Sequence, residues 1–280
     1  MMLKRVLVSI PIIMIIALAL FLQSWVIVLL VVALALFSQF ELVRAMSTSG
    51  KSVIKSVSYV FAAMSAVVFL LAYYNRTIAQ NMPVYMIMLF VILCIAAFII
   101  AIFSKEYSAD SVMHTIFTFI YPQLFFVMFY LLIIGNIANY GQMFAMFAMV
   151  FIPALLSDTL AYFFGKSFGK KKLCPTISPK KTIVGSVAGI AGGVIGALIV
   201  CLIVYLLGYT VGNIIIYTIV GALLAAISQI GDLSASFIKR ALDIKDFGKL
   251  LPGHGGILDR IDSVIFCIPI VFILAFLHIL

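Results

Sequence analysis

The sequence predicts an all-α integral membrane protein with about nine transmembrane helices. Of its 280 residues, 66% are hydrophobic and only 10% are charged, whereas about a quarter of the residues of a soluble domain are charged. So few polar residues cannot cover a surface that faces water on all sides. Apolar runs of about 20 residues, the length that crosses a bilayer as a helix, also recur along the chain.

The predicted spans follow one another closely, separated by short breaks that contain charged residues, Gly, Pro or Asn. They cover residues 6–22, 25–43, 53–74, 83–103, 114–135, 141–165, 183–207, 211–238 and 259–279. The first span resembles a signal peptide, but it has no convincing small-residue cleavage site and leads directly into the second, so we interpret it as a transmembrane helix. Two connections, 166–182 and 241–258, are longer. We accordingly divide the chain into an N-terminal transmembrane region, 1–150, and a C-terminal region, 151–280, that carries both long loops.

Basic residues set the expected topology and account for the net charge of +9. Cytoplasmic loops of membrane proteins carry an excess of Lys and Arg. With nine spans and a cytoplasmic N-terminus, every one of the 18 basic residues except Arg76 falls on the cytoplasmic side. Eight or ten spans would break this pattern. The charge therefore indicates membrane topology rather than a nucleic-acid partner, and it predicts that both long loops lie in the cytoplasm.

Acidic residues are scarce, and four of the nine interrupt or open predicted spans: Asp158, Asp232, Asp259 and Asp262. An Asp at the bilayer centre costs about 2.5–3.5 kcal/mol on insertion scales, so such residues usually line a cavity or pathway. In the predicted topology all four lie towards the cytoplasmic ends of their spans. Solvation at a helix end, or a hydrogen bond between helices, would explain one of them. Four on the same side predict a polar active-site cavity open to the cytoplasmic side.

The segment 228–262 contains most of the residues that could carry chemistry. On a helix, Ser228, Asp232, Ser236 and Lys239 are spaced by four, four and three residues and therefore share one face. This spacing predicts a polar stripe that descends into the membrane, with a cation at its watery end.

A Gly-rich loop follows this stripe. Gly255 and Gly256 have no side chain, so backbone amides in this loop can approach a ligand closely. The last predicted helix begins just after the loop, and the free amides and dipole of a helix N-terminus favour anions. His254 is a candidate base or phosphate contact, and a structural role in the loop is equally open.

Carboxylates placed among groups that attract phosphate indicate a divalent cation between them. Mg²⁺ takes oxygen ligands and is typically held by one or two carboxylates together with substrate phosphates. We expect Asp232 and Asp259 to hold it. Basic side chains would neutralise the remaining phosphate charge, and the candidates are Lys239, Arg240, Lys245 and Arg260. The pattern predicts phosphate-transfer chemistry.

A second anion site is expected at residues 177–185. Ser178 is a favoured N-cap residue, and Pro179 suits the first position of a helix. Lys180, Lys181 and Thr182 would then surround the amide end of the seventh span. Ordinary basic flanking of a transmembrane helix is the alternative for the two lysines.

These residues resemble the signature of phosphatidate cytidylyltransferases, also called CDP-diacylglycerol synthases. The similar segment runs over 27 residues, from Ser236 through Lys239-Arg240, Lys245-Asp246, Pro252, His254-Gly255-Gly256 and Asp259-Arg260 to Asp262. Two upstream segments, 157–162 and 178–182, are also similar to family segments and occur in the expected order. The resemblance covers about 151–262. One departure is Val184, where family members commonly carry Glu before Gly.

The resemblance implies a nucleotidyltransferase of phospholipid biosynthesis that converts CTP and phosphatidic acid into CDP-diacylglycerol and pyrophosphate with Mg²⁺. It assigns Asp232 and Asp259 to the metal, and it makes 151–280 the catalytic region. Residues implied in catalysis are Asp232, Asp259, Lys239, Arg240, Lys245, Asp246, His254, Arg260 and Asp262. Residues implied in substrate binding are Ser236, Lys180, Lys181, Thr182, Asp158, Gly255 and Gly256. Asp246 and Asp262 would orient the basic groups or contact a second cation.

Partners and location follow from the same reading. CTP comes from water and phosphatidic acid from the bilayer, so a multi-pass protein of the cell membrane with its site on the cytoplasmic side is expected. Gly185, Gly189 and Gly193 form a small-residue ridge that packs helices closely. This ridge serves packing within the chain, or between two copies in a homodimer.

The sequence bears differently on three other functional classes. An ion-coupled transporter would also hold intramembrane carboxylates, but discontinuous helices in paired halves are not evident. A related CTP-dependent enzyme with a prenol or an archaeal ether lipid as acceptor stays open. The DGx2ARx8Gx3Dx3D pattern of CDP-alcohol phosphotransferases is absent.

Overall fold

The computed structural model describes residues 24–135, 140–210, 212–250 and 255–280. The predicted first span, 6–22, and His254 lie outside the described residues. The chain forms two compact units. The first unit comprises Met1–Tyr130 with Ala241–Arg260, and the second comprises Leu131–Arg240 with Ile261–Leu280. The predicted division into an N-terminal region, 1–150, and a C-terminal region with both long loops, 151–280, stays a prediction.

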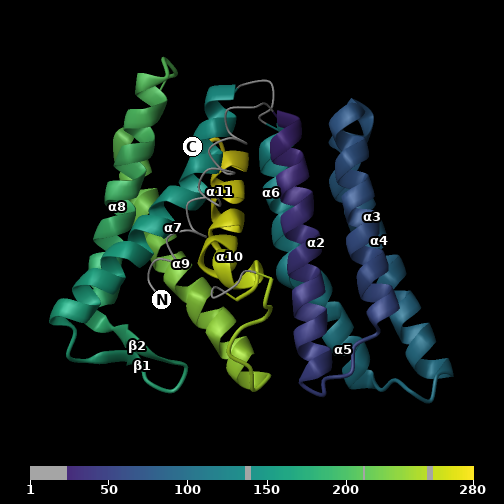
Figure 1. Ribbon diagram of the computed structural model, residues 1–280. Helices are drawn as coiled ribbons and strands as arrows, with labels where there is room; N and C mark the ends of the chain where they lie inside the picture. The colour runs from purple at the N-terminus through teal and green to yellow at the C-terminus, as the bar shows by residue number, and fades with distance from the viewer. Residues whose placement is uncertain (1–23, 136–139, 211, 251–254) are drawn as a thin grey trace. The chain divides into compact units, whose positions relative to one another are not determined.

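The described residues of the first unit form helices and the connections between them (Figure 1). In chain order they are α2 (Ser24–Thr48), α3 (Lys55–Tyr74), α4 (Arg76–Phe103), α5 (Ala109–Thr118), the π-helix η1 (Phe119–Leu124) and the start of α6 (Phe125–Gly135). α4 begins seven residues before the predicted span at Pro83. The side chain of Asn75 accepts hydrogen bonds from the amides of Thr77 (2.9 Å) and Ile78 (3.3 Å). This cap satisfies amides of the first turn, so the helix starts ahead of the proline.

Aromatic stacking between α3 and η1 and a buried polar cluster between α2, α3 and α5 hold these helices together in the first unit. The rings of Phe61 and Phe119 stack with centroids 4.4 Å apart. Gln39 donates from Nε2 to Thr118 Oγ1 at 3.0 Å, and the hydroxyls of Ser58 and Thr118 are also 3.0 Å apart. Hydrogen bonds between neighbouring helices are a common means of association where lipid surrounds the helices.

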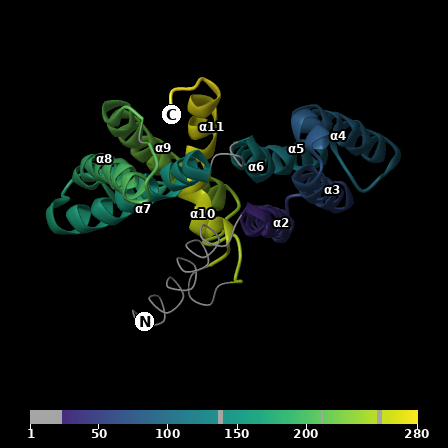
Figure 2. The ribbon, with the colours of Figure 1, turned by 90° about the horizontal axis from the view of Figure 1, so that it is seen from above.

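The second unit consists of long helices and one β-hairpin. Its elements are α7 (Tyr140–Phe168), β1 (Lys172–Cys174), β2 (Ser178–Thr182), α8 (Ile183–Leu206), α9 (Ile214–Ala241) and α11 (Cys267–Phe276). Helix α10 (Leu258–Ile265) contains the boundary between the units. The two strands are antiparallel and connect the ends of α7 and α8 (Figure 1). Seen from above, α7, α8 and α9 lie side by side (Figure 2).

The glycine ridge of α8 packs within the chain, which was one of its two predicted uses. Gly192 and Gly196 lie on α8 beside the predicted ridge residues. A Cβ on Gly192 would lie 2.6 Å from the Leu156 carbonyl oxygen of α7, and one on Gly196 would lie 2.7 Å from Pro153 Cα. On the other side, a Cβ on Gly193 would collide with Ala225 and Gly221 of α9. Only glycine permits these approaches, so the ridge sets how closely α8 meets both neighbours.

Seven helices in the described part of the chain are long and apolar enough to cross a bilayer. They are Trp25–Thr48, Lys55–Tyr74, Arg76–Phe103, Ala109–Ile134, Gly141–Phe168, Ile183–Leu206 and Ile214–Ala241. These correspond to the second to eighth predicted spans, so the predicted class of helical membrane protein is confirmed. The predicted ninth span is formed by two shorter helices, α10 and α11, which are separated at Phe266. The total of nine stays a prediction.

The hairpin is the main departure from the all-α prediction. Ser178 and Pro179 were expected to begin the seventh span, but both belong to β2. Thr182 is the N-cap instead, with an extended backbone (φ −125°, ψ 155°) and a side chain that accepts from the Gly185 amide at 3.1 Å. The amide of Ile183 also donates to the Lys171 carbonyl at 3.0 Å. Pairing with β1 therefore keeps 178–182 extended and delays the helix by four residues.

Candidate active site

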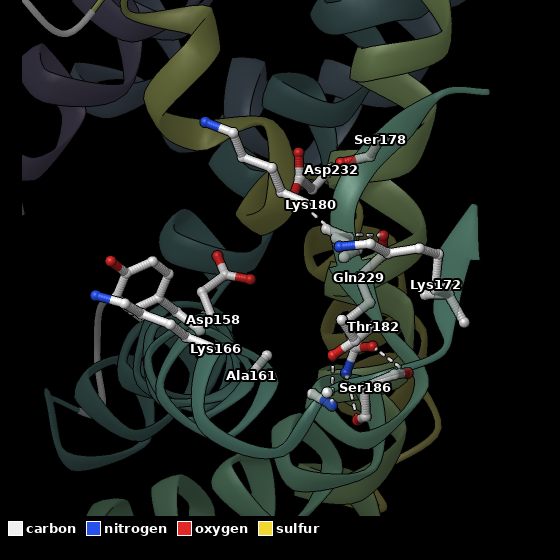
Figure 3. Close-up of a pocket in the computed structure, with 16 residues that line it drawn as sticks. Asp158, Ala161, Lys166, Lys172, Ser178, Lys180, Thr182, Ser186, Gln229 and Asp232 are labelled. Atoms are coloured by element: carbon white, nitrogen blue, oxygen red, sulfur yellow. Dashed lines mark hydrogen bonds and ion pairs between the residues drawn. The ribbon is translucent and has the colours of Figure 1, made fainter. Parts of the chain in front are cut away.

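A cavity of about 550 Å³ lies in the second unit between α7, the hairpin, α8 and α9 (Figure 3). Its lining contains five residues that the sequence singled out as substrate-binding or catalytic. These are Asp158, Lys180, Lys181, Thr182 and Asp232. They come from three elements, α7, β2 and α9, so the fold brings together residues that are far apart along the chain.

An ion pair crosses the cavity wall from the hairpin to α9. Lys181 Nζ lies 2.7 Å from Asp232 Oδ2, and the two side chains are 22% and 31% exposed. Lys181 also donates to the Gln229 carbonyl at 3.4 Å. Because water only partly screens this pair, its attraction is stronger than that of a surface pair. The lysine is therefore held at the cavity in a defined position.

Asp158 places a second carboxylate at the cavity. It lies on α7, where it experiences the negative charge of Asp232 and the positive charge of Lys181. Figure 3 shows Asp158 and Asp232 among the residues that line the cavity. Two carboxylates that repel each other are favoured in one cavity when a cation lies between or beside them.

Four lysines line the cavity and outnumber its two carboxylates. The sequence reading identified Lys180 and Lys181, and it missed Lys166 at the end of α7 and Lys172 on β1. Lys166 Nζ lies 5.9 Å from the centroid of the Tyr162 ring. Both missed lysines lie between the two upstream motif segments, 157–162 and 178–182, so only the folded hairpin reveals that they share a cavity with Lys180. The surplus of positive charge suits a ligand that carries phosphates.

Gln229 connects the three helices around the cavity, and the sequence reading did not single it out. Its Nε2 donates to Ser157 Oγ at 3.3 Å and to the Ser186 carbonyl at 3.1 Å. In return, Ser186 Oγ donates to Gln229 Oε1 at 2.5 Å. A Cβ on Gly189 would lie 2.6 Å from Gln229 Nε2, so this glycine makes room for the amide. The sequence did contain a signal for Gln229, because a polar amide side chain is unusual within the apolar part of α9.

The lower part of the predicted stripe on α9 pairs with α10. Lys239 Nζ lies 3.5 Å from Asp262 Oδ2, and both side chains are 11% exposed. Asp262 also accepts from the Ser263 amide through Oδ1 at 2.9 Å. The contact holds Lys239 beside Asp262, and the role of Asp262 in orienting basic groups or contacting a second cation stays a prediction. Ser228 is buried, Ser236 is half-buried and Arg240 is exposed.

The described residues 244–250 and 255–260, in the first unit, are organised around Asp259. Its Oδ2 accepts hydrogen bonds from the amides of Phe247 (2.8 Å) and Gly256 (3.0 Å). Gly255 has φ +83°, a conformation that favours glycine, and a Cβ there would lie 2.9 Å from the same oxygen. The glycines thus bring backbone close to a carboxylate of the chain, where we had expected them to approach a ligand.

Glu41 occupies the predicted anion position at the N-terminus of α10, and the sequence reading missed it. The amides of Ile257 and Leu258 donate to its two carboxylate oxygens at 3.0 and 2.9 Å. These two amides already have a partner, which corrects the expectation that they would bind a phosphate. Three other predicted site residues of this unit, Lys245, Asp246 and Arg260, are exposed.

The predicted metal ligands belong to different units, with Asp232 in the second and Asp259 in the first. Their pairing therefore stays a prediction. Within the described residues, no three His, Cys, Asp or Glu side chains form a group that could hold a metal by themselves. The carboxylates of Asp158 and Asp232 do fit Mg²⁺, which binds oxygen and takes only one or two carboxylates when phosphates and water complete its shell.

Comparisons with known proteins agree with this chemistry. The model of the cytidylyltransferase family matches residues 3–278. The phosphatidate cytidylyltransferase of Bacillus subtilis is 37% identical over 145 residues, which are 52% of each chain. Those of Staphylococcus haemolyticus and Staphylococcus aureus are 40% and 41% identical over 124 residues, 44% of this chain and 46% of each relative. The chain thus matches about half the length of these relatives.

Proposed function

This chain belongs to the cytidylyltransferase family, and on that premise we propose that it converts CTP and phosphatidic acid into CDP-diacylglycerol and pyrophosphate. The observation that carries the proposal is the cavity of the second unit, where four lysines and two carboxylates meet. A phosphorylated substrate and a cation would together balance these charges. The relatives named above carry the same activity in their names.

The proposed reaction is a displacement at phosphorus. A phosphate oxygen of the lipid attacks the α-phosphorus of CTP, the new P–O bond forms, and the bond to the leaving pyrophosphate breaks. Such reactions depend mainly on positioning and on neutralising charge. Lys180 and Lys181 would receive the lipid phosphate, and Lys166 and Lys172 add positive charge to the same cavity. The ion pair with Asp232 keeps Lys181 in place for this role.

Asp232 would hold Mg²⁺, with Asp158 close by in the same cavity and Asp259 as the second ligand that the sequence predicts. The bound cation would neutralise phosphate charge and orient the triphosphate. Asp232 Oδ2 pairs with Lys181, so a single carboxylate would link the lysine to the cation. Lys239, held by Asp262, would add a further positive charge for the phosphates.

A membrane enzyme explains why such a site lies in a helical bundle. The acyl chains of the lipid stay in the bilayer while its phosphate must meet a nucleotide that is dissolved in water. We propose a multi-pass protein of the cell membrane, with a cytoplasmic N-terminus and with the cavity open to the cytoplasm, where CTP is found. The basic residues of the hairpin and of the segment 239–249 support this orientation through the positive-inside bias.

The decisive experiment uses purified protein in liposomes with Mg²⁺, phosphatidic acid and labelled CTP, followed by chromatography of the lipids. We expect labelled CDP-diacylglycerol from the wild type and at least a hundredfold less from Asp232→Asn, which removes the charge and keeps the shape. Asp243→Asn is the matched control, because Asp243 is exposed and lies outside the cavity lining. Folded protein that makes no labelled lipid, or equal product from Asp232→Asn, would refute the proposal. Label transferred to a prenol or an ether lipid would show that the acceptor is that lipid and not phosphatidic acid.

A further inference from the structure

Glu41 is a buried carboxylate inside an apolar helix. It lies seven residues before the end of α2, about 10 Å along the helix axis, within the candidate span Trp25–Thr48, and the residue is only 5% exposed. A carboxylate in such a place is costly unless it has specific partners. The chain has just two glutamates, and the other, Glu106, is exposed. The burial of Glu41 within a candidate span therefore needs a structural reason, whereas an exposed charge such as Glu106 does not.

The partners of Glu41 are consecutive backbone amides at the start of α10. Oε1 accepts from the Ile257 amide and Oε2 from the Leu258 amide, so both oxygens are used. The preceding amide, that of Gly256, donates to Asp259 Oδ2. Two carboxylates thus divide three successive amides between them. Negative charge at a helix N-terminus is stabilised by the free amides and by the helix dipole.

Two glycines, Gly248 and Gly256, leave room for the Glu41 carboxylate against this segment. A Cβ on Gly248 would collide with Oε1 and would lie 3.0 Å from Glu41 Cγ. A Cβ on Gly256 would collide with Oε2 and would lie 2.5 Å from both Cδ and Oε1. Neither glycine has a positive φ, so the space occupied by Glu41 is the reason that these positions lack a side chain.

We propose that Glu41 is a positioning residue, which anchors Gly248 and residues 256–258 to α2 and thereby fixes the Asp259 carboxylate. Without Glu41 the amides of Ile257 and Leu258 lose their acceptors, and the first turn of α10 loosens. The backbone that surrounds Asp259 then moves, because the Gly256 amide that it binds is next in the chain. The inference rests on the proposed function only in assigning Asp259 to the reaction.

Hydrogen exchange tests the anchor directly, without any activity assay. In Glu41→Ala we expect the Ile257 and Leu258 amides to exchange at least about tenfold faster than in the wild type, as local opening becomes easier. Glu106→Gln, which changes the other glutamate, should leave their exchange unchanged. Glu41→Gln keeps one oxygen acceptor and should fall between the two. Unchanged exchange in Glu41→Ala would overturn the proposal.

A double-mutant cycle with Gly248→Ala separates positioning from general damage. Either single change should lower kcat about 10- to 100-fold, the usual effect of altering a group that supports a metal ligand. The KM for phosphatidic acid should hardly change, because the lipid is assigned to Lys180 and Lys181. In Glu41→Ala the added methyl of Gly248→Ala has room, so the double variant should be no worse than the poorer single one.

The outcomes distinguish this proposal from the proposed function. Additive losses in the cycle, or a raised KM for phosphatidic acid at unchanged kcat, would contradict a positioning role. If Glu41→Ala does not fold, Gly248→Ala alone decides through its exchange at Ile257 and Leu258, which should also accelerate. If the wild type makes no CDP-diacylglycerol, the exchange experiment still tests the anchor, and only the assigned reaction fails.

Discussion

Single residues at the cavity act mainly by holding others in place. Lys181 is paired with Asp232 at 2.7 Å and bonded to the backbone of α9, whereas Gln229 connects serines on α7 and α8. Each of these groups satisfies partners that are partly or fully buried. Removing one of them therefore changes the positions of the remaining groups as well as the local charge.

Lys181→Ala should reduce catalytic efficiency with phosphatidic acid. The change removes one of four cavity lysines and leaves Asp232 without this cation, so kcat/KM should fall at least tenfold, or about 1.4 kcal/mol. Lys170→Ala is the matched control, since Lys170 is exposed and does not line the cavity. Initial rates at a series of lipid concentrations measure the effect. Equal losses in the two variants would argue against a specific role for Lys181.

Gln229→Ala should destabilise the second unit. The amide makes hydrogen bonds that connect α7, α8 and α9, and such bonds between membrane helices contribute about 0.6 kcal/mol each on average. We expect a loss of about 1–2 kcal/mol in the free energy of unfolding and a lower Tm in detergent. Gln80→Ala, at an exposed position, should leave the Tm unchanged. A Tm equal to that of the wild type would show that water replaces the amide at no cost.

At the scale of elements, the position of α8 depends on glycines, whose lack of a side chain lets the backbones of α7 and α9 come close. Its glycines face α7 on one side and α9 on the other, so its position depends on the close approach of backbones. A larger residue has no rotamer that avoids these contacts, because the atoms it would meet belong to the main chain.

Gly192→Leu should therefore disrupt the second unit. Even the Cβ would lie 2.6 Å from the Leu156 carbonyl oxygen, so α7 and α8 must separate, at a cost of about 1–3 kcal/mol or more. Ala191→Leu places the same side chain on the exposed face of α8 and should be tolerated. Thermal unfolding of both variants in detergent gives the comparison. Equal stability would mean that α8 can shift without loss.

The long apolar helices and the glycine ridge could be predicted because both depend on local sequence. The hairpin could not, since Ser178-Pro179 and Thr182 are all acceptable helix beginnings and pairing with β1 selects the last. Lys180, Lys181 and Asp158 could be placed at the site from motif segments. Glu41 could not, because its partner Ile257 lies 216 residues further along the chain. A sequence shows a scarce carboxylate but not the amides that it binds.

At the scale of the whole molecule, the predicted topology can be tested through a natural cysteine. Cys174 is half-buried in β1, and the positive-inside bias places the hairpin in the cytoplasm. A membrane-impermeant maleimide should label it in inside-out vesicles and should not label it in intact cells. Cys174→Ser controls for other thiols, and Arg76→Cys in that background should show the reverse pattern. Labelling of Cys174 in intact cells would show that the hairpin lies outside and that the predicted topology is inverted.

The first unit is made from two pieces of chain, Met1–Tyr130 and Ala241–Arg260, and this has a consequence for biosynthesis. A ribosome adds about 5–20 residues per second, so the 216 residues between Glu41 and Ile257 take roughly 10–40 s to synthesise. During that interval α2 carries a carboxylate whose amide partners do not yet exist. A nascent chain released before residue 257 would keep that unmatched charge inside an apolar helix, where a carboxylate without partners is costly.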